Sequence, residues 1–303
     1  MNIDTNNSIV YQINSDFFNQ NNLQVFVKRD DLIHPIISGN KWRKLKYNIH
    51  SAINEGKKGI LTFGGAYSNH LHATAYACKM FSLKSLAFVR GEELNYFSNT
   101  TLMECNSFGM ELIFLNRKDY SLLKNDEKNV FFKKYLNDYY YVPEGGANIF
   151  GIEGAREIIK ELDFTPDFVF CAQGTSTTSC GILLELPLES SIIVVPVLKG
   201  YFSLNELNVL LQKYGLNKNE IDIKLNQVNV LDQYHFGGYG KHNSELISFI
   251  QFCKNELNIP LDHVYTAKVF YALYKECLKK EYKNKKILFV HTGGLQGSGF
   301  WKN

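Results

Sequence analysis

The chain has 303 residues, which is enough for one large domain or for two of about 150 residues each. Hydrophobic residues make up 45% and the formal net charge is only +3, so neither nucleic acid nor a membrane is indicated as a partner. The six cysteines form no CxxC pair, which argues against structural zinc and a disulfide framework and favours a reducing compartment. The first residues resemble no signal peptide, and no apolar run could span a bilayer, so we expect a soluble, unprocessed, cytoplasmic protein.

Short β-branched or aromatic runs alternate with helical periods along most of the chain, which predicts an α/β fold with buried parallel sheets. The expected strands are Gln24–Arg29, Ile60–Phe63, Ser85–Val89, Glu111–Leu115, Tyr139–Val142, Asp167–Cys171, Ile192–Val197 and Lys286–His291. The expected helices are Lys41–Glu55, His70–Phe81, Asn99–Phe108, Tyr120–Leu136, Ile152–Glu161, Leu204–Tyr214, Asn243–Leu257 and Ala267–Lys280.

Polar, glycine-bearing breaks follow four of the expected strands, at residues 64–70, 145–148, 174–178 and 291–294. Ligands of open parallel sheets bind at the carboxyl ends of the strands, so we expect these turns to converge on one site. In the third break, Gly174 is followed by Thr175, Ser176, Thr177 and Thr178 and then by a helical stretch. Its backbone N–H groups could bind an anion, but it has neither the lysine of a Walker A loop nor a GxGxxG pattern. A phosphate on a small cofactor therefore fits better than ATP or NAD, and a polar turn with helix caps is the alternative.

Lys41 stands out among the lysines because it is expected in the first turn of a helix, after Ser38-Gly39-Asn40 and beside an apolar stripe. Burial and the positive helix terminus both lower the pKa of an amine, and Schiff-base chemistry needs the neutral amine. The alternative is a solvated lysine beside Arg43, Lys44 and Lys46.

The segment Ser68-Asn69-His70 lies between an expected strand and an expected helix, where side chains can reach a ligand. Asn69 could donate to a phenolate-like oxygen and Ser68 to a carboxylate, or one of them could simply cap the helix. His70 and His72 are two apart on a helix and face different directions, so no metal site is expected.

Two tyrosines of the C-terminal half, Tyr239 and Tyr265, occur in polar or helix-leading contexts. For each of them, a purely structural role is the alternative to a functional one. The sequence shows no separate serine triad, carboxylate pair or metal-ligand cluster.

Several motifs, taken together, resemble one family of enzymes. They are VKRDDL, SGNKWRKL, FGGAYSNHLHATA, VPEGGAN, GIEGA, GTSTT, FGGYGK, VYTAK and HTGGLQG. In this order, from about Val27 to Gly297, they resemble the 1-aminocyclopropane-1-carboxylate deaminase and D-cysteine desulfhydrase family of pyridoxal-phosphate enzymes. The resemblance implies the two-domain, three-layer α/β/α, tryptophan-synthase-β-like fold (fold type II) and a homodimer. It also implies a larger cofactor-binding domain of residues 1–40 plus 144–303 and a smaller domain of residues 41–143.

The resemblance also implies roles for individual residues. Lys41 would be the Schiff-base lysine, and Asn69 would hold the 3′-oxygen of pyridoxal phosphate. Ser68, Asn69, His70 and Tyr239 would bind the substrate, a small amino acid. The phosphate would lie against Gly174–Thr178, where the family commonly has GTGGT and this chain has GTSTT. Ser176 and Thr177 thus replace two glycines, and either the backbone approaches the phosphate less closely or side chains substitute for it.

By the same resemblance, Thr266 in VYTAK faces the pyridine nitrogen, where the cyclopropane deaminases have a carboxylate that keeps the ring protonated. A hydroxyl resembles the desulfhydrase branch, so we expect β-elimination of D-cysteine to pyruvate, sulfide and ammonia. Lys41 would remove the α-proton, and Tyr239 or Tyr265 would be the acid. One alternative is deamination of 1-aminocyclopropane-1-carboxylate to 2-oxobutanoate and ammonia, in which a nucleophile or acid near Tyr239, Tyr265 and the catalytic candidate Ser68 would open the ring. The other is a non-catalytic protein that binds pyridoxal phosphate or an amino acid. A Rossmann oxidoreductase would need a glycine fingerprint that the chain lacks.

Overall fold

The computed structural model describes residues 3–37, 39–125, 130–200 and 203–295. Ser38, residues 126–129 of the expected helix Tyr120–Leu136, and the last two residues of the HTGGLQG motif therefore lie outside the described residues. The chain divides into two compact units. The smaller unit comprises Met1–Ile3 and Lys41–Gly154, and the larger unit comprises Asp4–Asn40 and Ala155–Asn303.

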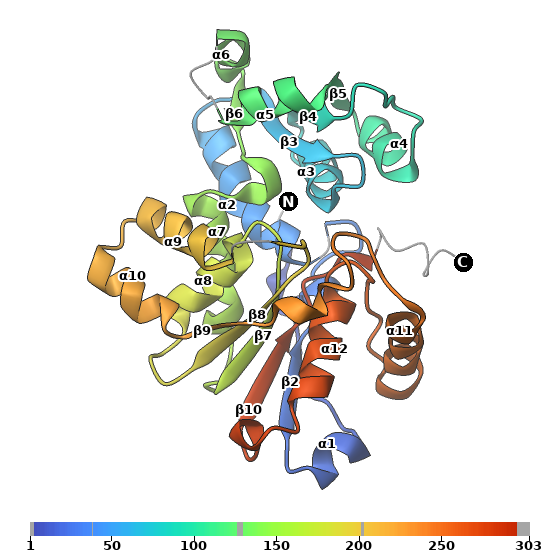
Figure 1. Ribbon diagram of the computed structural model, residues 1–303. Helices are drawn as coiled ribbons and strands as arrows, with labels where there is room; N and C mark the ends of the chain where they lie inside the picture. Colours follow the sequence, from blue (N-terminus) through green and yellow to red (C-terminus); the bar gives the residue numbers. More distant parts are fainter. Residues whose placement is uncertain (1–2, 38, 126–129, 201–202, 296–303) are drawn as a thin grey trace. The chain divides into compact units, whose positions relative to one another are not determined.

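The larger unit contains a six-stranded sheet in the order β1-β2-β10-β7-β8-β9 (Figure 1). The strands are β1 (Val10–Gln12), β2 (Gln24–Lys28), β7 (Phe168–Gln173), β8 (Ser191–Pro196), β9 (Val228–Val230) and β10 (Lys286–Val290). Every pair is parallel except β1 with β2. The sequence predicts four of these strands; β1 and β9 have three residues each, which is too short for a periodic signal.

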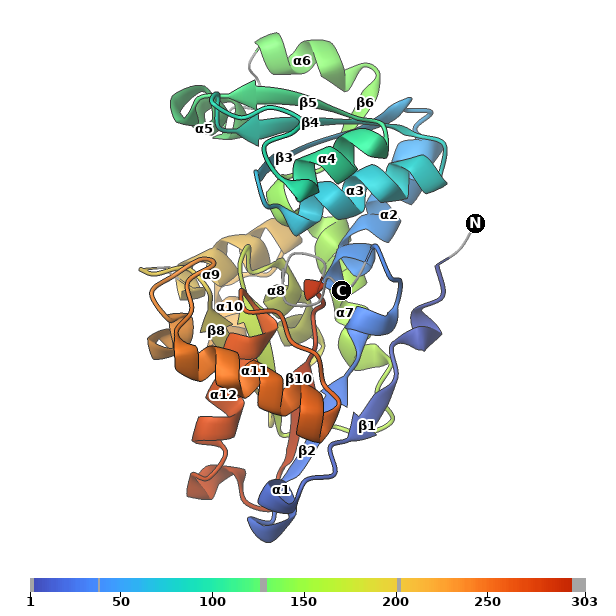
Figure 2. The ribbon, with the colours of Figure 1, turned by 90° about the vertical axis from the view of Figure 1, so that its right-hand side faces the viewer.

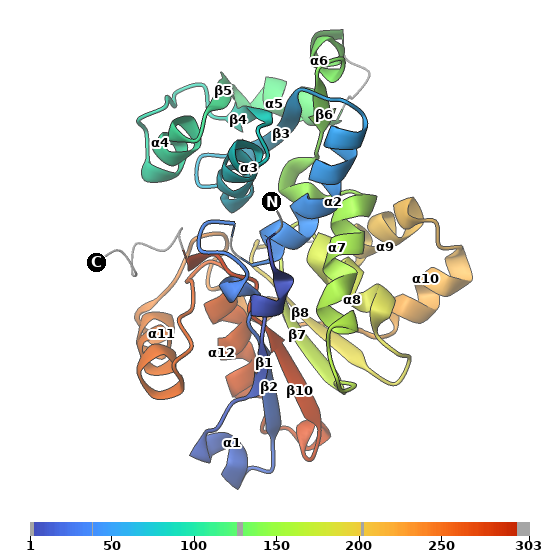
Figure 3. The same ribbon diagram turned by 180° about the vertical axis from the view of Figure 1, so that it is seen from behind.

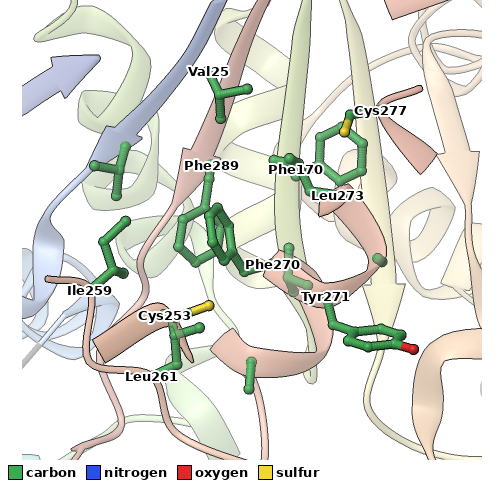
Figure 4. Packing of buried hydrophobic residues seen from close by; sticks show 14 of the residues in the cluster. Val25, Phe170, Cys253, Ile259, Leu261, Phe270, Tyr271, Leu273, Cys277 and Phe289 are labelled. Carbon is green, nitrogen blue, oxygen red and sulfur yellow. The ribbon is translucent and has the colours of Figure 1, made fainter. Parts of the chain in front are cut away.

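Helices cover both faces of this sheet (Figure 3). They are α1 (Asp16–Gln20), the second half of α7 (Ile149–Lys160), α8 (Thr177–Glu185), α9 (Ser203–Tyr214), α10 (Lys218–Leu225), α11 (Ser244–Leu257) and α12 (Thr266–Glu276). Figure 4 shows the core between α12 and the sheet, where Phe270 packs against Phe289 at 4.8 Å between ring centroids. Val169 and Cys171 alternate with Phe170 along β7 and are fully buried as well, as expected for a parallel strand covered on both faces.

The smaller unit has a four-stranded, all-parallel sheet in the order β5-β4-β3-β6. Its strands are β3 (Gly59–Gly65), β4 (Lys84–Arg90), β5 (Met110–Leu115) and β6 (Tyr139–Tyr141). Helices α3 (Asn69–Met80) and α4 (Thr100–Ser107) pack on one face, and α5 (Arg117–Asn125) and α6 (Val130–Leu136) on the other (Figure 2). Helix α2 (Asn40–Asn54) stacks Trp42 on Phe81, the residue that follows α3.

The expected single helix Tyr120–Leu136 is wrong, because two helices occur there, α5 and α6. The segment from Lys124 to Asn129 is entirely polar and offers no side chain for the core, whereas Leu123 and Phe132 on either side of it are both buried against the sheet. Apart from this, the predicted α/β alternation and the parallel sheets are confirmed.

Two further observations concern the chain as a whole. All six cysteines are buried and unbridged. Within the described ranges, no helix has both the length and the apolar character to cross a membrane.

Candidate active site

The segment just before Lys41 is fixed within the larger unit. The backbone N–H of Asn40 donates to the carbonyl oxygen of Thr292 (3.2 Å), and its side-chain amide donates to Thr178 Oγ1 (2.8 Å). Gly39 has φ +66°, and a Cβ on it would lie 1.9 Å from the Thr292 oxygen. Only glycine fits there, so the chain enters α2 in a fixed register and places Lys41 at the second position of the helix.

In the smaller unit, Lys41 and the SNH segment lie close enough to influence each other. Burial is the main cause that lowers the pKa of His70, to about 3, and the positive charges of Lys41 and Lys44 lower it further. His70 is therefore neutral, and its Nε2 lies 2.9 Å from Thr62 Oγ1. The His70 side chain is buried at the base of the segment, next to the residues predicted to bind substrate.

Ser68 caps helix α3, as the structural alternative for this residue predicts. Its Oγ accepts a hydrogen bond from the backbone N–H of Leu71 (3.3 Å), and its backbone is extended. The cap uses a lone pair of the oxygen, so the hydroxyl hydrogen can still be donated to a carboxylate. Asn69, the first residue of α3, is partly exposed at the same edge of the sheet, where β3 ends at Gly65.

The loop Gly174–Thr178 connects β7 to the start of α8. Ser176 is the N-cap residue but makes no capping hydrogen bond with its side chain. The first N–H groups of an α-helix have no partner within the helix, and they carry the positive end of the helix dipole. The N-terminus of α8 can therefore take an anion the size of a phosphate, as the sequence predicts.

Ser176 explains how the loop works without one of the glycines of GTGGT. It has φ +55°, in the left-handed region that glycine normally occupies. Its Oγ accepts a hydrogen bond from the side-chain amide of Gln173 (2.9 Å). Thr177 Oγ1, at the first residue of α8, lies 3.2 Å from Thr175 Oγ1 in the loop. The donor set fits a phosphate, and the serine keeps the glycine-like backbone.

The two candidate tyrosines and the phosphate loop are neighbours within the larger unit. The rings of Tyr239 and Tyr265 pack edge to face, with 6.1 Å between their centroids. A Cβ on Gly174 would lie 3.4 Å from Tyr265 Cε1, so this ring lies against the loop. Tyr265 immediately precedes α12, and Tyr239 is 45% exposed.

Lys268 holds the turn that carries Tyr239. Its Nζ donates to the carbonyl oxygens of His235 (2.8 Å) and Gly238 (2.7 Å), and its side chain is fully buried. Burial lowers the pKa of this amine to about 8, and the charge of Asp262 acts in the opposite direction. Sequence reasoning missed Lys268; the only signal was its place as the last residue of VYTAK.

Thr266 is buried and bound to Asp262, a second residue that sequence reasoning missed. The Thr266 hydroxyl donates to Asp262 Oδ1 (2.7 Å) and accepts from the Asp262 backbone N–H (2.9 Å). The backbone N–H of Thr266 also donates to Oδ1, and those of Val264 and Tyr265 donate to Oδ2. Aspartate side chains accept hydrogen bonds from nearby backbone N–H groups at turns and helix starts, so the aspartate shortly before VYTAK was the signal available in the sequence.

The predicted site residues thus form two groups. The smaller unit gathers Lys41, Ser68, Asn69 and His70, and the larger unit gathers Gly174–Thr178, Tyr239, Tyr265 and Thr266. Among the residues that the structure describes, no three His, Cys, Asp or Glu side chains are arranged to hold a metal ion.

Known proteins resemble this chain over most of its length. The family model "Pyridoxal-phosphate dependent enzyme" matches residues 13–293. "Putative 1-aminocyclopropane-1-carboxylate deaminase" of Thermotoga maritima is 32% identical, over 90% of this chain and 89% of that protein. "Bifunctional D-cysteine desulfhydrase/1-aminocyclopropane-1-carboxylate deaminase, mitochondrial" of Arabidopsis thaliana is 30% identical, over 91% of this chain and 74% of that protein. The solved structure "Crystal Structure Analysis of the ACC deaminase homologue" has a TM-score of 0.78 at 27% identity, covering 96% of this chain and 90% of that chain.

Proposed function

The chain belongs to the pyridoxal-phosphate dependent enzymes, and on this premise we propose that it catalyses β-elimination from a small amino acid, with D-cysteine as substrate. The family, the cofactor and fold type II that the motifs predicted are confirmed. Bound pyridoxal phosphate supplies an electron sink for the α-carbon of an amino acid. The protein supplies the groups that hold the cofactor and substrate and that move protons. We assign the cofactor-binding part to the larger unit.

Thr266 is the observation that carries the choice of β-elimination. In the proposed site it is the residue beside the pyridine nitrogen, and its hydroxyl proton is donated to Asp262. Asp262 accepts four hydrogen bonds, so its carboxylate is already satisfied by its own loop. A neutral hydroxyl supports a less strongly protonated ring than a carboxylate would. Loss of a good β-leaving group demands less from that ring than opening a cyclopropane does.

The proposed roles of the remaining groups follow from their chemistry. Lys41 would hold the cofactor through its amine, and the same amine would remove the substrate α-proton. The N-terminus of α8 would hold the phosphate, Asn69 would donate to the ring oxygen, and Ser68 would donate to the substrate carboxylate. One of the two neighbouring tyrosines, Tyr239 or Tyr265, would protonate the departing thiolate. Water then completes the reaction, so that D-cysteine and water give pyruvate, hydrogen sulfide and ammonia.

The test compares the wild type with Lys41→Ala, each mixed with pyridoxal phosphate and then with D-cysteine. We expect an absorbance band of bound cofactor that requires Lys41, and release of pyruvate and sulfide in equal amounts. Lys44→Ala is the matched control, because Lys44 lies one turn further along the same helix and is not expected to hold the cofactor. Absence of a Lys41-dependent band would refute the assignment of Lys41.

The same assay mixtures distinguish the two alternatives, a 1-aminocyclopropane-1-carboxylate deaminase and a non-catalytic binding protein. Release of 2-oxobutanoate from 1-aminocyclopropane-1-carboxylate without sulfide from D-cysteine would favour the deaminase, an activity named for the Thermotoga and Arabidopsis relatives. A Lys41-dependent band with neither product, and without exchange of the substrate α-proton in heavy water, would favour a non-catalytic binding protein.

We also propose that the enzyme acts in the cytoplasm as a homodimer. Six buried, unbridged thiols support a reducing compartment. Light scattering of the purified protein at two concentrations tests the dimer, and a monomer at both would contradict it.

A further inference from the structure

We propose that the smaller unit has a second binding site, for a phosphate monoester of a small metabolite, beside helix α5. The site is a cavity of about 410 Å³ lined by Arg90, Arg117, Tyr120, Ser121, Lys124 and Asn125. Arg90 is the last residue of β4, and the other five residues belong to α5. Figure 2 shows α5 on the sheet face opposite α3 and α4. The proposal does not depend on the function proposed above, because none of these residues has a role in it.

The charge of the lining calls for an anion. Arg90, Arg117 and Lys124 are basic, and none of the described residues that line the cavity is acidic. Glu144 pairs with Lys124 (2.6 Å) and offsets one of the three charges. In the part of the chain that the structure describes, neither arginine forms an ion pair. Two positive charges therefore remain, which matches the dianion of a phosphate monoester.

Tyr120 forms the buried wall of the cavity. Its side chain is 3% exposed. Burial is the main cause that raises the pKa of its hydroxyl, and the neighbouring Glu144 carboxylate raises it further. The Arg90 guanidinium lies over the Tyr120 ring, 5.7 Å from its centroid, so the ring supports one of the two arginines. The ring stays in place by packing edge to face on Phe63, at 5.5 Å between centroids.

The donor groups and the volume of the cavity define the class of ligand that would fit. Guanidinium groups present paired donors that match the oxygens of a tetrahedral oxyanion, and one lysine adds a point charge. The volume exceeds that of phosphate alone and lies in the range of small-molecule pockets. Ser121 and Asn125, whose side chains lie 3.4 Å apart, supply neutral polar groups for the organic part.

The experiment uses the holoenzyme, in which pyridoxal phosphate already occupies the phosphate loop, and measures binding of inorganic phosphate by calorimetry at physiological chloride. We expect saturable binding at millimolar phosphate and displacement by sulfate but not by chloride. R90Q and R117Q should each weaken binding about tenfold or more, since each removes a charge-assisted contact. Tyr120→Phe keeps the ring under Arg90 and its packing on Phe63, so it should leave phosphate binding within about twofold of the wild type.

The matched control is Lys118→Gln, an exposed lysine of the same helix that does not line the cavity. It should leave phosphate binding unchanged, and the melting temperatures of R90Q, R117Q and K118Q should stay close to that of the wild type because these three side chains are exposed. Absence of saturable binding to the wild type would overturn the proposal. Equal weakening by R117Q and K118Q would also overturn it, because binding would then reflect diffuse surface charge.

Discussion

Replacing Lys268 with methionine should destabilise the larger unit and reduce catalysis at the same time. Methionine fills the volume of the lysine stem but donates no hydrogen bond, so the carbonyl oxygens of His235 and Gly238 lose their partner. Each bond from a charged donor is worth about 1.5–3 kcal/mol, and relief from burying the amine offsets part of that loss. We expect the free energy of unfolding to fall by about 2–4 kcal/mol. Because this turn positions Tyr239, kcat for sulfide release should fall about tenfold or more.

The pH dependence of stability gives an additional readout for Lys268. The folded protein releases the Lys268 proton near pH 8, whereas the unfolded chain holds it to about its ordinary pKa of 10.5. Between these values the unfolded state binds more protons, so this lysine makes the free energy of unfolding rise with pH. Lys268→Met should lack that rise. Urea unfolding between pH 7 and pH 10, a range set by these pKa values, measures it.

Lys275→Met is the control for Lys268→Met, because Lys275 lies on the same helix and forms an exposed pair with Glu245. Exposed pairs contribute little, so this variant should lose no more than about 1 kcal/mol and retain its kcat. A Lys268→Met protein with wild-type kcat would refute the positioning role of Lys268. An unchanged free energy of unfolding would refute the contribution of its two hydrogen bonds.

Three shorter predictions test other parts of the structure. Ser176→Gly should change the free energy of unfolding by less than about 1 kcal/mol, because glycine adopts the left-handed backbone without strain and this offsets the lost hydrogen bond to Gln173. A larger decrease in the free energy of unfolding, measured in urea, would contradict this. Gly154→Ala should lower the free energy of unfolding by about 3 kcal/mol or more, because the new Cβ would lie 1.8 Å from the backbone oxygen of Arg43. A wild-type melting temperature would contradict this and show that the two backbone segments can move apart. His70 is held neutral with a pKa of about 3, so the unfolded state binds more protons and stability falls as pH drops from 6.5. His70→Gln should flatten that pH dependence, and an unchanged slope would assign it to other groups.

The fold was largely predictable because the strands carry their own signal. Residues 168–172 of β7, for example, are apolar on both faces, which is the pattern of a central parallel strand. The strands that escaped prediction, Val10–Gln12 and Val228–Val230, lie at the two edges of the large sheet and are too short for any period to show. The break between α5 and α6 was also missed, because a polar stretch on a helix resembles a solvated helix face.

The sequence motifs of the site could be predicted, but the hydrogen bonds that connect them could not. Lys41, Ser68 and the Gly174–Thr178 loop each follow a strand or begin a helix, which is a local property of the sequence. The contacts that fix them are not local. Asn40 reaches Thr178 across 138 positions of the chain, and no period or turn rule connects two such residues.

The strand order of the large sheet has a consequence for how the protein is made. The last strand, β10, lies between β2 and β7, so the first two strands join the sheet only through the final part of the chain. The segment Lys41–Gly154, by contrast, contains every strand of its own sheet and can close as soon as it leaves the ribosome. We therefore expect the smaller unit to fold first during synthesis. One edge of β2 stays unpaired until β10 has been synthesised. A ribosome stalled before Lys286 would carry one finished sheet and one that lacks its centre.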